Sequence, residues 1–478
     1  MKYNIAKMIT VVFIGIFLIV YLLVHYDGHK YNIENAEAFV RKICELEDVP
    51  GMSIVVLDNE QEYYINVGHA DRNRKVDMTS EIRCELGSTT KAFTALGVLL
   101  LEQDGKLNRT DSVEDYLPWF NPTYEGKRVD ITLEHLLCHT SGIPTWTIAN
   151  LPMGTANDIG LLEDTVKGIQ AVELNSEPGT VHNYATINYD VLALIIEEVS
   201  GMTFEEYIRE TVLEPLGMSN SYFRVDDSKT EQLAQGYRYA FLGTRKYDAP
   251  TFYGNTAAGY LVSNTEDLAI WMKAQMGLFD MDVTEEIAKI ERAITESHSY
   301  PTEQGQHYFA GWNLYDTYFC HSGNNPNFSS QVIVGRTNGK AVFALANVCG
   351  SAPTTAADGI YRMMQGETVE IGFLLDGNAL VDLISFIICI IELYALLVLF
   401  EKRKSKKYVG VMAIRTLIMA IIVLVFPYIL NYNYLTIAIW FSPCLLLAIA
   451  GVEICFICYL VLYMCNHKKC IYDTFENK

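Results

Sequence analysis

The sequence predicts an α/β (α+β) fold in which one antiparallel sheet is flanked by helices and joined to a mainly helical lobe, with transmembrane helices at both ends. Two observations support this prediction. Strand-like runs lie at the two ends of a central polar region, and helical periodicity fills the part between them. Four nearly uncharged runs outside that region are each long enough to cross the roughly 30 Å core of a bilayer. A purely cytosolic soluble protein is therefore excluded.

The four apolar runs divide the chain of 478 residues into five parts. We expect one N-terminal and three C-terminal transmembrane helices, at Met8–Val24, Ala379–Phe400, Gly410–Leu430 and Leu435–Met464. The predicted parts are an N-terminal signal anchor (1–27), an outer domain (28–366), a linker (367–378), a three-helix transmembrane domain (379–464) and a tail (465–478). The anchor is taken as uncleaved because no small-residue cleavage site stands out before Tyr26; a removed signal peptide is the alternative.

Basic residues cluster on one side of these runs. Lys2 and Lys7 precede the first run, residues 401–407 (EKRKSKK) join the second to the third, and residues 467–469 follow the fourth. The positive-inside rule places these clusters and both termini in the cytoplasm, and the outer domain outside the cell membrane of a multi-pass protein. Inside the runs, Glu392 and Arg415 are expected to pair, because an isolated charge in lipid is costly, whereas Glu453 has no assigned role.

The overall charge narrows the choice of partners. The chain carries 36 basic and 57 acidic residues, of which 25 basic and 51 acidic ones lie within residues 25–378. Such a negative field repels phosphate backbones, so nucleic acid is excluded as a partner. The lipid bilayer is the expected partner of the apolar runs, and the oligomeric state is left open.

Within the outer domain, periodicity and turn residues predict the elements in order. A helix at Ile33–Leu46 is followed by a hairpin of Met52–Leu57 and Glu62–Val67, and a strong helix over Ser88–Gln103 ends before Gly105. Further helices are expected at Leu133–Cys138, Asn188–Ser200, Thr203–Val212, Thr265–Met276 and Thr354–Met364, and strands at Phe309–Phe319, Phe328–Gly335 and Ala341–Val348. The strands from both ends would form one sheet, with the helical part as an inserted lobe.

The 11 cysteines predict neither a disulfide framework nor a metal site. Five of them lie in the outer domain, an odd number without close pairs. Cys455 and Cys458 lie in an apolar run, where a single helix cannot complete a four-ligand zinc site. We expect small buried apolar side chains, and neither a metal nor a cofactor.

The main candidate for chemistry is the segment Ser88-Thr89-Thr90-Lys91, which opens a predicted helix. Residues three apart share a helix face, so the Ser88 hydroxyl and the Lys91 amine would meet at the N-terminus, where the helix dipole favours negative charge. The serine can then attack a carbonyl, provided that burial lowers the pKa of Lys91 from about 10.4 toward 7. The motif alone is weak, and a capped helix with a surface lysine is the alternative.

Two further segments carry candidate groups. Tyr184 lies where a loop enters a helix and can shuttle a proton, although a packed aromatic side chain is the alternative. His321-Ser322-Gly323 lies between two predicted strands, where the glycine lets a ligand approach the backbone. The N–H of Asn324 can then join that of Ser88 in an oxyanion hole, and an ordinary polar loop is the alternative.

In order and spacing, these segments resemble the SxxK serine hydrolases of the class C β-lactamase and penicillin-binding-protein family. The resemblance covers roughly residues 33–365 and is carried also by residues 131–144 (ITLEHLLCHTSGIP), 183–201 (NYATINYDVLALIIEEVSG), 258–271 (AGYLVSNTEDLAIW) and 321–330 (HSGNNPNFSS). It implies a β-lactamase-like fold in which Ser88 is the acylated nucleophile, and Lys91 and Tyr184 move the protons. It also implies that residues 321–324 lie on a strand beside the substrate, although the segment prediction places them after one.

Two departures from the family pattern affect the expected substrate. The usual Tyr-Ser-Asn is here Tyr184-Ala185-Thr186, which removes an amide that would bond the substrate. The usual Lys-Thr-Gly is His321-Ser322-Gly323, which weakens the fixed positive charge for a substrate carboxylate. Both changes disfavour an efficient β-lactamase.

The arrangement of spans around the outer domain looks like that of the membrane-bound prodrug-activating peptidases of nonribosomal peptide pathways (the colibactin and zwittermicin type). This resemblance implies that an N-acyl-D-asparagine cap is removed from an exported precursor, so a small peptide or acyl-peptide is the expected substrate. Thr186, Asn255 and Asn324 are candidates to read the asparagine side chain. An active site held at the bilayer also meets an acyl-chain substrate at raised effective concentration.

Other functions stay open at this stage. A D-Ala-D-Ala carboxypeptidase or related cell-wall peptidase, an esterase and a β-lactamase are the enzymatic alternatives. A penicillin-binding sensor that signals through its spans is the non-enzymatic one. The intact Ser88, Lys91 and Tyr184 and the small cytoplasmic share of the chain argue against a sensor.

Overall fold

The computed structural model describes most of the chain. The described residues are 31–155, 158, 160–223, 232–279, 284–299, 307–371, 376–402 and 432–475, with isolated positions between 414 and 425. The predicted spans Met8–Val24 and, for the most part, Gly410–Leu430 lie outside the described residues. Arg415 does too, so its predicted pairing with Glu392 stays a prediction.

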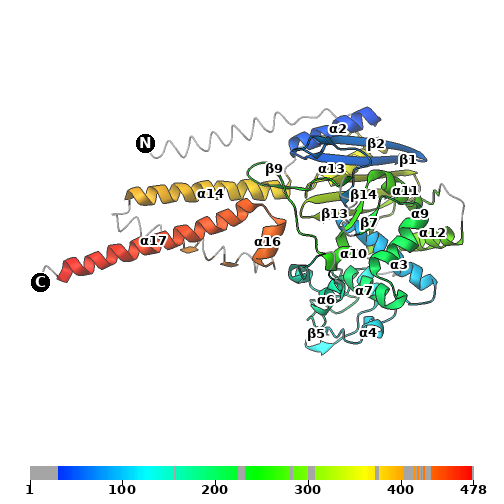
Figure 1. Ribbon diagram of the computed structural model, residues 1–478, viewed down its shortest axis with the longest axis horizontal. Coiled ribbons are helices and arrows are strands. Elements are labelled where there is room, and N and C mark those ends of the chain that lie inside the picture. Colours follow the sequence, from blue (N-terminus) through cyan, green and yellow to red (C-terminus); the bar gives the residue numbers. More distant parts are fainter. Residues whose placement is uncertain are drawn as a thin grey trace.

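An eight-stranded antiparallel sheet in the order β11-β12-β13-β14-β15-β1-β2-β3 forms the centre of the outer domain (Figure 1). Its strands are β1 (Gly51–Asp58), β2 (Gln61–Asp71), β3 (Val76–Asp77), β11 (Tyr308–Phe309), β12 (Trp312–Leu314), β13 (Tyr318–Asn325), β14 (Phe328–Gly335) and β15 (Lys340–Ala346). The N-terminal hairpin joins the C-terminal strands because β1 pairs with β15, from Met52 opposite Ala346 to Asp58 opposite Lys340. The prediction of one sheet built from both ends of the domain is confirmed.

Helices cover both faces of the sheet, which explains why β1 is apolar along nearly its whole length. Ile54 faces a core shared with α2 (Ile33–Leu46) and α13 (Ala352–Met364). Its neighbour Val55 points to the opposite face and joins a larger core there. On that face α11 (Thr265–Gln275) packs against β1 and β15.

The larger core belongs to the predicted helical lobe between the two groups of strands. Its helices are α3 (Lys91–Gln103), α4 (Val113–Tyr116), α5 (Leu133–Leu137), α6 (Leu161–Lys167), α7 (Asn188–Ser200), α8 (Phe204–Ile208), α9 (Glu214–Leu216), α10 (Thr256–Gly259) and α12 (Glu285–Ser297). A small sheet of β4 (Cys84–Glu85), β10 (Leu261–Ser263) and β7 (Tyr222–Phe223) supports the lobe. There are also two hairpins, β5 (Thr123–Tyr124) with β6 (Lys127–Arg128) and β8 (Tyr237–Tyr239) with β9 (Thr244–Lys246). In the second, Tyr237 and Tyr239 pack in the core shared with α2 and α13. The expected helix over Thr203–Val212 is α8 followed by a wider π-helical turn at Arg209–Leu213.

The prediction of a single strand over Phe309–Phe319 is wrong. Ala310 and Gly311 both have positive φ and form a tight turn, so that Phe309 pairs with Trp312. The segment therefore contains β11, β12 and the start of β13. As a consequence, residues 321–324 lie within β13 rather than after a strand. The placement implied by the family resemblance is the correct one.

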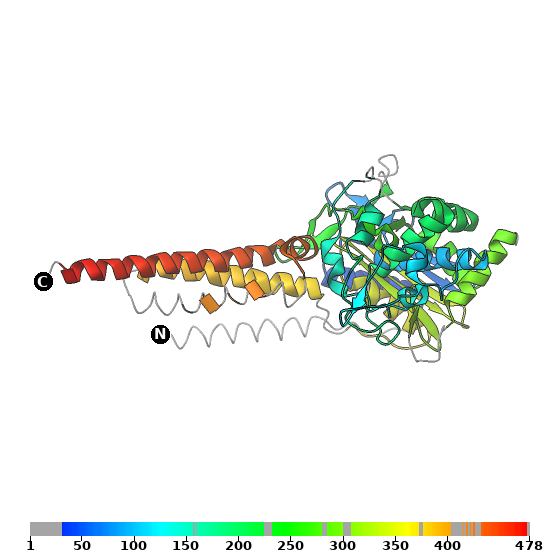
Figure 2. The same cartoon turned by 90° about the horizontal axis from the view of Figure 1, so that it is seen from below.

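Two helices in the described residues are long and apolar enough to cross a membrane. They are Gly377–Val398 within α14 (Gly377–Lys402) and Pro443–Val461 within α17 (Pro443–Phe475). Both project side by side from one end of the domain (Figure 2). The helices run parallel, since the Cys389 thiol lies against the Cys444 carbonyl and the Tyr459 hydroxyl donates to the Ala395 carbonyl further along.

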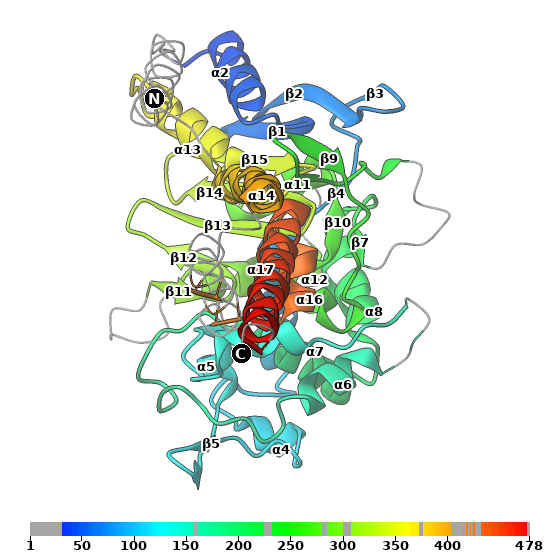
Figure 3. The same cartoon turned by 90° about the vertical axis from the view of Figure 1, so that its left-hand side faces the viewer.

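The prediction of one continuous helix over Leu435–Met464 is also wrong. A short helix, α16 (Tyr434–Trp440), ends before Phe441, and α17 starts afresh at Pro443. The Ser442 hydroxyl accepts a hydrogen bond from the backbone N–H of Cys444, as an N-terminal cap does. Proline has no N–H to continue a preceding helix but fits the first helical position. The chain therefore changes direction, and α16 lies against the domain beside α17 (Figure 3).

Asp382 in α14 ties the projecting helices to the outer domain. Its buried carboxylate accepts hydrogen bonds from the backbone N–H groups of Phe241 and Leu242, at the tip of the β8–β9 hairpin. It also accepts one from the hydroxyl of Ser442, between α16 and α17. The side chains of Phe241 and Leu242 are 46% and 56% exposed, so the hairpin presents an apolar tip beside the first turns of α14.

Besides Asp382, the two candidate membrane-spanning segments contain the acidic residues Glu392 and Glu453. Glu392 is buried against α17, where its Cβ lies beside Gly451 and its carbonyl faces the Cys455 thiol. Glu453 has one carboxylate oxygen buried without a hydrogen-bond partner among the described residues. The structure assigns it no role.

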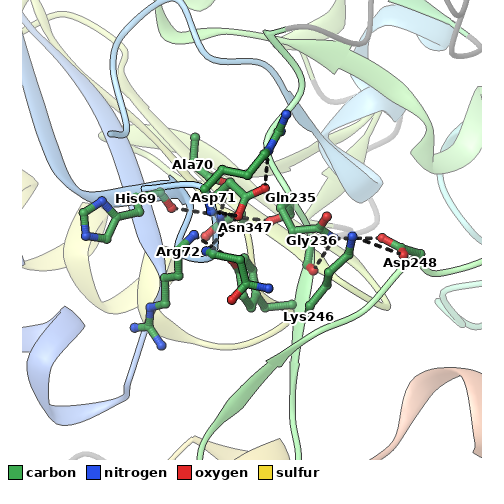
Figure 4. Close-up of polar contacts among 12 residues, drawn as sticks. His69, Ala70, Asp71, Arg72, Gln235, Gly236, Lys246, Asp248 and Asn347 are labelled. Carbon is green, nitrogen blue, oxygen red and sulfur yellow. Dashed lines mark hydrogen bonds and ion pairs between the residues drawn. The ribbon is translucent and has the colours of Figure 1, made fainter. Parts of the chain in front are cut away.

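Asn347, directly after β15, joins the end of that strand to two segments that are distant in the sequence (Figure 4). Its fully buried amide nitrogen lies 3.1, 3.2 and 3.0 Å from the carbonyl oxygens of His69, Ala70 and Gln235. It thereby holds the end of β2 against the segment that leads to β8. Backbone carbonyls in such a place need a donor, because water does not reach them.

We expect Asn347→Ala to destabilise the protein by roughly 1–3 kcal/mol, because buried carbonyls lose their donor. Denaturant or thermal unfolding of the detergent-solubilised chain measures the change. Exposed Asn121 offers a matched control, and Asn121→Ala is expected to stay within about 0.5 kcal/mol of the parent. Equal stability of the two variants would contradict this account of Asn347.

Candidate active site

Ser88 and Lys91 meet at the start of α3. Ser88 lies in the 3₁₀ turn η1 (Gly87–Thr90), and Lys91 is the first residue of α3. Because a 3₁₀ helix has three residues per turn, side chains three apart project in the same direction. The Lys91 Nζ lies 3.1 Å from the Ser88 Oγ, which is hydrogen-bonding distance. The structure thus brings together the two groups that the sequence selects.

Two glycines let the turn of Ser88 approach strand β13. Gly87 has a φ of +58°, and a Cβ there would lie 2.4 Å from the backbone nitrogen of Asn324. A Cβ on Gly323 would lie 2.0 Å from the carbonyl oxygen of Leu86 and 3.0 Å from the backbone nitrogen of Ser88. The backbone N–H groups of Ser88 and Asn324 therefore lie close together, as an oxyanion hole requires.

The Lys91 amine is enclosed. The residue is fully buried, and its Nζ donates a hydrogen bond to the Ala258 carbonyl at 2.6 Å. The same nitrogen lies 5.2 Å from the centre of the Tyr184 ring. Burial lowers the pKa of Lys91 from 10.5 to about 7, against the opposing effect of the Asp190 carboxylate. An amine with this pKa can take the proton of the Ser88 hydroxyl near neutral pH.

Tyr184 lies beside the pair as a protonated phenol. Burial raises the pKa of Tyr184, and the neighbouring hydroxyls of Ser88 and Thr186 lower it by less. Its buried Oη has no well-aligned hydrogen-bond partner among the described residues. The phenol is therefore free to donate its proton to an atom of a bound substrate, which makes it suited to protonate a leaving group rather than to start the attack.

His139 supports Tyr184 from behind. It is fully buried, and its ring centre lies 4.1 Å from that of Tyr184. Its Nδ1 accepts from the backbone N–H of Ala185 and lies 3.1 Å from the side-chain nitrogen of Asn188. Burial, with the Lys91 charge nearby, lowers the pKa of His139 well below its usual range, so the ring is neutral. Sequence reasoning noted the segment of His139 as a motif but gave the residue no role.

Asp190 is a second residue that sequence reasoning missed. It lies in the first turn of α7, fully buried, and its carboxylate interacts electrostatically with Lys91. The side-chain nitrogen of Asn255 donates to Asp190 at 2.5 Å. Burial raises the pKa of Asp190 well above its usual range. The signal that could have found it is an acidic residue within the otherwise apolar run 189–196.

His321 occupies its site on β13 without a charge. The Nδ1 lies 2.6 Å from the carbonyl oxygen of Ser322 and must donate to it, which leaves Nε2 to accept from the Tyr308 hydroxyl at 3.1 Å. Burial, with a smaller effect of the Lys91 charge, lowers the pKa of His321 to about 3. The ring therefore offers no positive charge to a substrate.

A cavity of about 450 Å³ opens in front of these groups. Its lining includes these residues predicted from the sequence: Ser88, Tyr184, Thr186, Asn255, His321, Ser322 and Asn324. The other two predicted residues, Lys91 and Gly323, do not line the cavity but lie behind these side chains. No arginine or lysine lines the cavity in the part of the chain that the structure describes.

One wall of the cavity comes from the C-terminal part of the chain. Leu435, Thr436, Ile439 and Trp440 of α16 line it, together with Ile148, Leu151 and Met153 of the lobe. Sequence reasoning missed this contribution because it assigned α16 to a membrane span. The structure thus joins the candidate active site to the projecting helices.

Comparison with known proteins gives the family. A family model described as Beta-lactamase matches residues 39–365, which include all nine predicted site residues. The chain belongs to the beta-lactamase family. Protein flp of Staphylococcus aureus (strain MRSA252) is 31% identical over 63% of this chain and 60% of its own length. Penicillin-binding protein 4* of Bacillus subtilis (strain 168) is 30% identical over 60% of this chain and 65% of its own length. The match therefore spans under two thirds of either relative.

A solved structure supports the same conclusion. The octameric penicillin-binding protein homologue from Pyrococcus abyssi is 28% identical, with a TM-score of 0.60, over 71% of this chain and 78% of that one. The predicted beta-lactamase-like fold and family are confirmed.

We expect an alkyl fluorophosphonate to add one phosphonyl group to Ser88, because the serine oxygen displaces fluoride with Lys91 close by to take its proton. Intact-mass and peptide mass spectra locate the adduct. Ser88→Ala is expected to remove the adduct. Ser80→Ala is the control, since the hydroxyl of Ser80 bonds Glu266 outside the cavity. An adduct that survives in Ser88→Ala would contradict the assignment.

We expect the rate of substrate cleavage to rise with pH through about 7, because Lys91 accepts a proton only in its neutral form, which increases as the pH passes its pKa. The measurement is kcat/KM against pH for an amide substrate. Asp190→Asn is expected to move this rise to lower pH, since the carboxylate raises the pKa of Lys91.

Glu85, whose carboxylate accepts a hydrogen bond from the cavity-lining Asn325, also titrates in this range, because burial raises its pKa to about 7. Glu85→Gln is therefore the control and is expected to keep the rise. A rise that disappears in Glu85→Gln would assign it to Glu85 and contradict the role of Lys91.

Proposed function

We propose that this chain is a membrane-anchored serine peptidase that removes an N-acyl-D-amino-acid cap, preferably N-acyl-D-asparagine, from an exported peptide. One observation carries the proposal. Ser88 and Tyr184, with Lys91 directly behind Ser88, face a cavity that is uncharged near the Ser88 hydroxyl and apolar on the side of α16. Such a cavity suits an amide that carries a hydrocarbon chain and no carboxylate next to the bond.

In this mechanism the Ser88 oxygen attacks the carbonyl carbon of the capping residue while its proton passes to the Lys91 amine. The N–H groups of Ser88 and Asn324 stabilise the oxyanion that forms. The C–N bond then breaks, and the leaving amine takes the Tyr184 proton, which the Lys91 ammonium replaces. Water hydrolyses the resulting ester, which releases the N-acyl amino acid and restores Ser88.

The neutral state of His321 favours this substrate over the alternatives. D-Ala-D-Ala peptides and penicillins carry a carboxylate close to the bond that is cleaved. Binding of that group would leave a negative charge in a partly buried site without a cationic partner, which is unfavourable. A cap joined to a longer peptide places no carboxylate there.

Thr186 and Asn324 are the proposed readers of the asparagine side chain. Both line the cavity, and Asn324 lies on the open edge of β13, because β12 pairs with β13 only as far as Cys320 among the described residues. Asn255 also lines the cavity, but its side-chain nitrogen is engaged by Asp190. It can offer its oxygen alone.

We further propose that α14 and α17 cross the membrane, with the outer domain on the extracytoplasmic side and both termini in the cytoplasm. Large apolar side chains along the helices are exposed, among them Ile390, Leu393, Tyr394, Leu397, Ile454 and Ile457. A lipid environment would cover them. Lys402 ends α14 away from the domain, where the positive-inside rule places a basic cluster.

A cell-wall peptidase of D-Ala-D-Ala type is the second candidate. The observation in its favour is the similarity to penicillin-binding protein 4* of Bacillus subtilis. The open edge of β13 suits an extended peptide of either kind.

We expect the full chain in lipid nanodiscs to cleave an N-myristoyl-D-Asn amide at least about tenfold faster than the L-Asn isomer, a D-Ala-D-Ala peptide or nitrocefin. Product release measured by mass spectrometry reports the rates, and Ser88→Ala is expected to abolish them. Faster cleavage of the D-Ala-D-Ala peptide would contradict the proposal and indicate a cell-wall peptidase. Faster cleavage of nitrocefin would contradict it and indicate a β-lactamase. Acylation by penicillin without turnover of any substrate would indicate a sensor.

A further inference from the structure

Helix α16 is held against the outer domain by a set of hydrogen bonds. The side chains of Asn433 and Thr436 both donate to the carbonyl of Ala149, at 2.7 and 3.3 Å. On the other side, the Tyr247 hydroxyl donates to the carbonyl of Ile439 at 3.1 Å. These bonds join α16 to two separate segments of the outer domain, so its position is built into the fold.

An apolar cluster continues from α16 into the cavity. Ile439 packs with Phe252 and Tyr260, and Leu151 and Trp440 pack against this group. All five side chains line the cavity that contains Ser88. The cavity therefore has a polar half around the Ser88 hydroxyl and a continuous apolar half at α16. A substrate that fills both halves is amphipathic.

The apolar half lies at the place where the chain enters α17. Only Phe441 and Ser442 separate α16 from Pro443, the first residue of a helix that is long enough to cross a membrane. Leu435 and Met153 line the cavity and are nevertheless 59% and 52% exposed, so they lie at its opening. The opening is therefore apolar and faces the region where the proposed bilayer begins.

We infer that α16 and the cluster of Leu151, Phe252, Tyr260, Ile439 and Trp440 form a subsite for the hydrocarbon chain of an amphipathic substrate, which enters from the membrane. This inference rests on the proposed function in so far as the substrate must carry such a chain. A chain in this subsite passes from lipid to protein without crossing water. The residues of α16 thus select the length of the substrate's hydrocarbon chain, whereas Ser88 cleaves the bond.

The test uses alkyl fluorophosphonates with a short (ethyl) or a long (tetradecyl) chain, which label Ser88 whatever the natural amide is. The full chain in nanodiscs is labelled under identical conditions, and the rates of adduct formation are compared by intact mass. We expect the long chain to react at least about tenfold faster than the short one. In Leu435→Ser and Ile439→Ser, this ratio is expected to fall several-fold, because both side chains line the cavity.

Tyr434→Ser is the matched control. Tyr434 is the exposed residue next to Leu435 on the same helix, but it does not line the cavity. It is expected to keep the parent ratio, which assigns the fall in Leu435→Ser and Ile439→Ser to the cavity. Partition of the long probe into the nanodisc alone would leave the ratio unchanged in all three variants.

Equal rates for the two chains in the parent protein would overturn the subsite, and a preference that Leu435→Ser and Ile439→Ser both retain would overturn the role of α16. These outcomes are distinct from failure of the proposed function, which is a lack of D-Asn amide cleavage by a protein whose Ser88 still reacts with the probes.

Discussion

The uncharged state of one buried amine is the constraint on which the rest of the site depends. Burial lowers the pKa of Lys91 from 10.5 to about 7, so deprotonation of the amine is about 5 kcal/mol more favourable than in water. The fold achieves this by enclosing the Nζ between Ser88, the Ala258 carbonyl and the ring of Tyr184. Burial, together with the charged form of Lys91, lowers the pKa of both His139 and His321, so these imidazoles are neutral.

Local periodicity was sufficient to predict much of the fold. The bounds of α2, α7 and β14 agree with those expected, because each has a regular apolar pattern with clear turn residues at its ends. One sheet built from both ends of the domain was also predicted, and the pairing of β1 with β15 is where the two ends meet. The break between α16 and α17 at Phe441–Ser442 was not predicted. A uniformly apolar run has no periodicity, so one Ser-Pro pair within it does not reveal where a helix ends.

In the candidate site too, some residues could be predicted from the sequence and others could not. Ser88, Lys91 and Tyr184 were found from sequence, because short motifs place the first two at the start of a helix and Tyr184 in the loop before one. Asp190 and His139 were missed, since a buried polar residue resembles any other core residue until its neighbours are known. The wall made by α16 could not be found at all, because its contact with Ala149 joins residues far apart in the chain.

The position of α16 late in the chain has a consequence for biosynthesis. The ribosome releases Ser88, Lys91 and Tyr184 long before it releases α16, and the domain that encloses Lys91 can fold as soon as α13 has emerged. A nascent molecule thus possesses its reactive serine while its cavity still lacks one side. The cavity is complete only when α16 docks on the domain and the Ser442 hydroxyl reaches Asp382. Docking of α16 is in this sense a late step in building the candidate site.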